Sequence, residues 1–113
     1  SEALKVLAMM ARHFRLLYQI KYLAVQGVRN FDAVSDELRG LMMNEANPLT
    51  AHPYQKKKLI QQAHAFSLGE LEACLRQVLE CELSMKGLGG GGTPRLNLEV
   101  LLLKLCRRGR AHQ

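Results

Sequence analysis

Apolar residues recur every three or four positions between residues 67 and 86, which predicts an amphipathic α-helix. Ser67 followed by Glu70 is the arrangement of a capping box, in which each side chain accepts a hydrogen bond from the other residue's backbone N–H. A fully buried aliphatic side chain contributes roughly 1.5–3 kcal/mol and a cap about 1 kcal/mol. The cap therefore sets where the helix begins, and the apolar stripe requires the helix to pack against a neighbour. The stripe consists of Leu68, Leu71, Leu75, Val78, Leu79 and Leu83.

Two further helices, predicted over residues 3–26 and 95–108, are apolar on nearly every side. The first is expected to end at Gly27, and its polar residues form one narrow stripe. A helix with so thin a polar face lies at the centre of a bundle or is covered by a second protein. The stripe consists of Lys5, Arg12, Arg15, Gln19 and Gln26. The candidate subunit-interface residues on the two helices are Phe14, Leu17, Leu98, Leu101, Leu102 and Leu105.

Three charged residues, Lys21, Glu82 and Glu99, fall on otherwise apolar faces. The stem of Lys21 can lie on apolar surface while its ammonium group reaches solvent. Alternatively, Lys21 forms a buried ion pair, and Glu82 or Glu99 is then expected within ion-pair distance. Because an unpaired buried charge is costly, the three residues either pair or mark a surface that another chain completes.

The middle of the chain carries weaker helical patterns. Residues 31–43 predict a short helix capped by Asn30 or Asp32, and residues 44–51 predict a loop. A further helix is expected over residues 53–65, because proline is favoured at the first helical position. His52, directly before it, is interpreted as a turn or cap residue.

No segment alternates with the two-residue period of a strand, so the sequence predicts an all-α fold, a compact bundle of about five helices with no sheet. The 113 residues have the length of a single domain, residues 1–113, and the helical start at residue 2 suggests a piece of a longer polypeptide. No stretch has the length and apolarity of a membrane span or the pattern of a signal peptide. Three cysteines within helical patterns favour small core residues in a reducing compartment, here the cytoplasm.

No catalytic, cofactor-binding or metal-binding residues are predicted. Gly87 and Gly92 have the separation of a phosphate-binding loop, but Thr93 stands where that loop needs lysine, and a helix precedes it. We interpret the glycine tract as a flexible connector. The four histidines and three cysteines lack metal-ligand spacing, and nothing in the sequence orients a nucleophile and its base.

The net charge of +6 and the pI of about 9.6 are compatible with nucleic-acid binding, and equally with a device for solubility. Residues 56–58 are three consecutive lysines, which spread around a helix and cannot all face one partner. A solvated face is the simpler interpretation, and contact with phosphates is the alternative. The alternative function is therefore a small basic helical domain that binds nucleic acid through these lysines and Arg107, Arg108 and Arg110.

Several segments resemble, in order, those of one known family. His52-Pro53-Tyr54 with Lys57-Lys58-Leu59 resembles its HPF…KKL helix, and residues 66–71 its FSLEEL helix start. Residues 82–86 are similar to its acid-L-x-x-K segment. Residues 94–106 resemble its leucine-rich final helix, and residues 14–17 with Lys21 its opening helix. The family is the C-terminal domain of the delta subunit of bacterial DNA polymerase III.

The resemblance implies a helical collar domain that joins equivalent domains of the other clamp-loader subunits, gamma/tau and delta-prime. It implies a non-catalytic part of a longer protein that supports loading of the sliding clamp in DNA replication. The clamp and DNA would be contacted only through the parent protein or its complex. A collar domain of delta-prime or another loader subunit is a related possibility. The sequence departs from the family at residues 44–51 and at the glycine tract, and the resemblance is weakest over residues 27–51.

Overall fold

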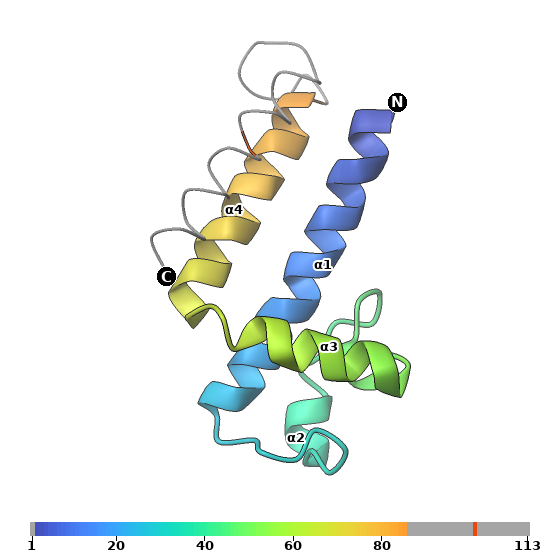
Figure 1. Cartoon of the computed structure of the whole chain (residues 1–113), viewed down its shortest axis with the longest axis vertical. Coiled ribbons are helices and arrows are strands. Elements are labelled where there is room, and N and C mark those ends of the chain that lie inside the picture. The colour runs from blue at the N-terminus through green and yellow to red at the C-terminus, as the bar shows by residue number, and fades with distance from the viewer. Residues whose placement is uncertain (1, 86–100, 102–113) are drawn as a thin grey trace. The chain divides into compact units, whose positions relative to one another are not determined.

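The computed structural model describes residues 2–85 and Leu101 (Figure 1). Over this part of the chain the all-α prediction is confirmed, with four α-helices, one short 3-10 helix and no strand. The last predicted helix, residues 95–108, lies outside the described residues apart from Leu101. The elements in chain order are α1 (Glu2–Val25), α2 (Asp36–Arg39), the 3-10 helix η1 (Pro48–Thr50), α3 (Pro53–Ala63) and α4 (Leu68–Met85).

The chain divides into two compact units. The described residues of the first unit are 2–14, 72–85 and Leu101, and the second unit is 15–71. The organisation of residues 1–113 as one domain stays a prediction.

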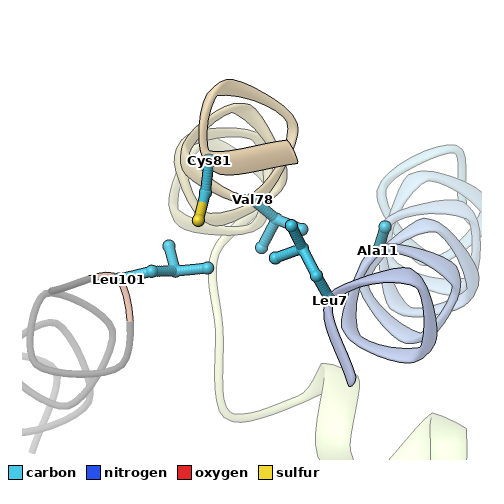
Figure 2. Close-up of a cluster of buried hydrophobic side chains, with 5 residues drawn as sticks. All are labelled: Leu7, Ala11, Val78, Cys81 and Leu101. Atoms are coloured by element: carbon cyan, nitrogen blue, oxygen red, sulfur yellow. The ribbon is translucent and has the colours of Figure 1, made fainter. Parts of the chain in front are cut away.

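In the first unit, α1 and α4 lie side by side around an apolar cluster (Figure 1). Figure 2 shows the side chains of this cluster pointing toward one another from α1, α4 and Leu101. Cys74 and Cys81 are buried, as expected for cysteines that serve as small core residues. The five buried members are Leu7, Ala11, Val78, Cys81 and Leu101, and Met10, Phe14 and Met85 pack against them.

The second unit has its own cluster, formed by the end of α1, α2 and the segments beside α2. Leu23, Val34 and Met42 are its buried members. The segments around α2 thus have a core despite their weak helical pattern. The half-buried side chains that pack against the cluster are Tyr22, Val28, Phe31, Leu38 and Leu49.

α1 ends in a Schellman motif at Gly27, as predicted. The Gly27 N–H donates to the carbonyl of Ala24, and the Val28 N–H donates to that of Leu23, each at 3.0 Å. Gly27 has a φ of +96°, a conformation that side chains with a Cβ rarely adopt. Val28 and Leu23 also meet in the apolar cluster, which completes the motif.

The helix predicted over residues 31–43 is much shorter, because polar side chains bond the local backbone in other ways. Ser35, and neither Asn30 nor Asp32, caps α2, accepting from the Leu38 N–H at 3.4 Å. Asn30 instead accepts from the N–H of Asp32 at 3.0 Å, closing a turn before the helix begins.

The start of α3 is as predicted, whereas its end comes two residues early. His52 is the N-cap and accepts from the Tyr54 N–H through Nδ1 at 3.2 Å, and Pro53 follows as the first helical residue. The predicted loop before α3 contains η1, capped by Asn47, whose side chain accepts from the Leu49 N–H at 3.0 Å.

The capping box of α4 is present with both hydrogen bonds. The Glu70 N–H donates to Ser67 Oγ at 3.1 Å, and the Ser67 N–H donates to Glu70 Oε1 at 2.8 Å. The helix begins at Leu68, directly after the capping serine.

Alanine at two glycines is expected to change stability in opposite directions. At Gly69 an added Cβ meets nothing closer than 4.0 Å, so Gly69→Ala should raise the free energy of unfolding by about 0.5–1 kcal/mol. At Gly27 space is open but φ is positive, so Gly27→Ala should lower it by about 1–2 kcal/mol. Urea denaturation followed by circular dichroism at 222 nm measures both. Changes of the same sign in the free energy of unfolding of the two variants would contradict the argument from the positive φ of Gly27.

Candidate functional site

The candidate interface residues are not all at the surface. Leu17 and Leu101 are each only 2% exposed, so the chain itself covers most of both side chains. Their apolar character was evident in the sequence, but the neighbour that covers them was not. Phe14 is half-buried against the first apolar cluster. Leu98, Leu102 and Leu105 lie outside the described residues, and the interface role of all six candidate residues stays a prediction.

The first unit exposes other apolar side chains. On α1, Met9 is 71% exposed and Val6 is also exposed. The two are three positions apart and so share a helix face. Leu83 on α4 is exposed as well. We call Val6, Met9 and Leu83 the first-unit apolar residues. Sequence reasoning missed Val6 and Met9, because a helix that is apolar on nearly every side does not reveal which side stays uncovered.

The second unit exposes a separate set of apolar side chains. Leu41 follows α2, Met43 begins the loop to η1, and Val25 ends α1. Tyr54, in the first turn of α3, is 65% exposed.

Gln19 does not belong to a solvent-facing polar stripe. Its side chain is buried, 6% exposed, and is fully used in hydrogen bonds. Nε2 donates to the carbonyl of Ala46 at 2.6 Å and to that of Arg15 at 3.0 Å. Oε1 accepts from the Met43 N–H at 2.8 Å. The bonds to residues 43 and 46 join the loop before η1 to α1 within the second unit.

The predicted ion pairs of Lys21 are not tested by the structure. Lys21 is half-buried in the second unit and Glu82 is half-buried in the first, while Glu99 lies outside the described residues. The pairing therefore stays a prediction. By contrast, Glu72 and Arg76, one turn apart on α4, form an exposed ion pair at 2.9 Å.

The three lysines of α3 have three different surroundings, as their spread around the helix predicted. Lys56 is 11% exposed and its Nζ lies 2.9 Å from Oδ1 of Asp32. Lys57 is exposed, and Lys58 Nζ lies 4.7 Å from the ring centre of Tyr54. The three ammonium groups therefore do not share one environment, and contact of this run with phosphates stays a prediction.

An open groove of about 890 Å³ lies in the second unit, between the end of α1, residues 27–32 and α3. Its lining includes Val28, Arg29, Phe31, Lys57 and Ile60. It combines an apolar floor with positive charges, and sequence reasoning did not find it, because its walls come from segments about 30 residues apart.

Within the described residues, no group of three or more histidine, cysteine, aspartate or glutamate side chains is placed to hold a metal ion. No helix among the residues described has the length and apolarity needed to cross a membrane.

Comparisons with known proteins agree with the resemblance seen in the sequence. The model of the family "DNA polymerase III delta subunit, C-terminal domain" matches residues 1–105. The DNA polymerase III subunit delta of Bacillus subtilis (strain 168) is 32% identical over 107 residues, which cover 95% of this chain and 27% of that protein. The chain thus spans about a quarter of the length of this relative. No solved structure matches it.

Replacing Gln19 with leucine, which is similar in size, should destabilise the protein strongly. The change leaves the part-buried Met43 N–H and the buried Ala46 carbonyl without their partner, and an unpaired buried group costs about 1–3 kcal/mol. We expect the free energy of unfolding in urea to fall by about 2–4 kcal/mol, and amide exchange at Met43 to accelerate.

Gln26→Leu is the matched control, since Gln26 is an exposed glutamine at the end of the same helix. Its effect should stay within about 0.5 kcal/mol. Similar losses for the two variants would show that the hydrogen bonds of Gln19 contribute little.

Proposed function

The chain belongs to the family of C-terminal domains of the DNA polymerase III delta subunit, and from this membership we propose that it is a subunit-association module, the collar domain of a clamp loader. In this role the domain is non-catalytic and binds the corresponding domains of other loader subunits, gamma/tau and delta-prime. It thereby supports loading of the sliding clamp in DNA replication. The clamp and DNA are contacted through the parent protein or its complex.

The single observation that carries this proposal is the match of the family model over residues 1–105, nearly the whole chain. The order of the short motifs supports it independently, from His52-Pro53 at the start of α3 to the capping box of Ser67 and Glu70.

The first-unit apolar residues support an association role in physical terms. Val6 and Met9 lie on one face of α1 and remain exposed next to a well-filled core. Covering a valine or methionine side chain fully contributes roughly 1.5–3 kcal/mol. A neighbouring subunit that covers these side chains would gain binding free energy with no rearrangement of the core beneath them.

The double variant Val6→Asp with Met9→Asp should weaken association with the other loader subunits at least about tenfold, because it removes apolar contact and places two charges at the interface. The measurement is size-exclusion chromatography of the chain mixed with purified gamma/tau and delta-prime, with affinities from titration. Leu41→Asp is the matched control, since Leu41 is an exposed apolar residue of the second unit.

One outcome tests the association role itself, and another tests which residues form the interface. Failure of the unmodified chain to co-migrate with any loader subunit would overturn the association role. An equal loss for Leu41→Asp would place the interface elsewhere than the first-unit apolar residues. Circular dichroism at 222 nm shows that each variant is folded.

A further inference from the structure

The groove of the second unit has an apolar floor that no side chain of the unit fully covers. Ala24, Val28, Phe31 and Ile60 line it, and all four are half-buried. A volume of about 890 Å³ is enough for several side chains of a ligand. The floor therefore offers a site for apolar side chains of a partner.

The groove also carries positive charge that no carboxylate among the described residues neutralises. Arg29 and Lys57 are exposed, and neither side chain is bonded to another residue in the part of the chain that the structure describes. Asp32, the only carboxylate residue in the lining, is paired with Lys56 at 2.9 Å. Two net positive charges therefore remain at the groove.

The apolar floor and the two positive charges together restrict the class of ligand that fits the groove. A nucleic-acid backbone is held by several cations that follow its phosphates, whereas only two uncommitted cations line this groove. A simple anion would not contact the apolar floor, and a neutral apolar molecule would not pair with the charges of Arg29 and Lys57. A peptide that carries apolar side chains between carboxylates uses both parts.

We propose that this groove binds a short acidic peptide segment of a partner protein. The segment places one or two apolar side chains against Val28, Phe31 and Ile60, and its carboxylates face Arg29 and Lys57. The inference goes beyond the association role, because the groove lies in the second unit and the first-unit apolar residues lie in the first.

The test uses a fluorescein-labelled ten-residue peptide of aspartate and glutamate with one phenylalanine and one leucine, and fluorescence anisotropy with the full chain. We expect saturable binding that weakens as salt is added. Arg29→Glu and Lys57→Glu should each weaken binding at least about fivefold, since each replaces an attraction with a repulsion. Lys58→Glu is the matched control, because Lys58 is the next residue on α3 and does not line the groove. It should change the affinity less than about twofold, because a charge outside the groove acts only through screened, longer-range attraction.

Two further probes separate the classes of ligand. The same peptide with serine in place of phenylalanine and leucine should bind at least about tenfold more weakly, since it lacks the side chains for the floor. A labelled ten-residue oligothymidylate tests nucleic acid. Saturable binding of the oligonucleotide, weakened by Lys57→Glu, without binding of the acidic peptide would overturn the proposal.

Absence of saturable peptide binding, or equal losses for Lys57→Glu and Lys58→Glu, would also overturn it. Circular dichroism at 222 nm confirms that the charge variants are folded. The groove variants are not expected to alter co-migration with the loader subunits. Absence of peptide binding would therefore leave the association role unaffected, and absence of co-migration would leave the peptide proposal unaffected.

Discussion

The side chain of Gln19 organises the least regular part of the protein. Residues 26–52 contain only a four-residue helix and one 3-10 turn, and the backbone hydrogen bonds of their turns join residues at most five positions apart. Gln19 supplies two long-range bonds, to Met43 and Ala46, from a rigid position within α1. The bond to Ala46 is buried and the bond to Met43 is part-buried, so both are costly to break and help to fix where the loop before η1 lies. The position of that loop in the second unit thus depends on this amide together with the buried side chains of Met42 and Ala46.

The features that the sequence predicted well depend on interacting residues that are close to one another in the chain. The capping box of Ser67 and Glu70, the proline start of α3 and the stop at Gly27 all involve groups within five residues of one another. Such local bonds are specified by residue type and spacing alone. The all-α fold follows in the same way, because the period of apolar residues is also a local property.

The features that the sequence did not reveal depend on distant neighbours. Gln19 looked like a member of a solvent-facing stripe because its partners lie 24 and 27 residues away. Leu17 and Leu101 looked available to another protein because nothing in the sequence shows that the chain covers them itself. The groove was missed for the same reason, since Arg29 and Lys57 line it from segments that lie far apart in the sequence. Tertiary packing decides such cases, and a single sequence carries little information on it.

The buried thiols of the first unit offer a chemical measure of how often its core opens. Cys74 and Cys81 are 1% and 8% exposed, so a thiol-modifying reagent in water has almost no access to either sulfur while the core is closed. Cys81 belongs to the apolar cluster between α1 and α4, so its modification rate follows how often these helices separate, and a partner that holds them together slows it. The side chain that fills part of this core thereby allows the opening of the core to be measured.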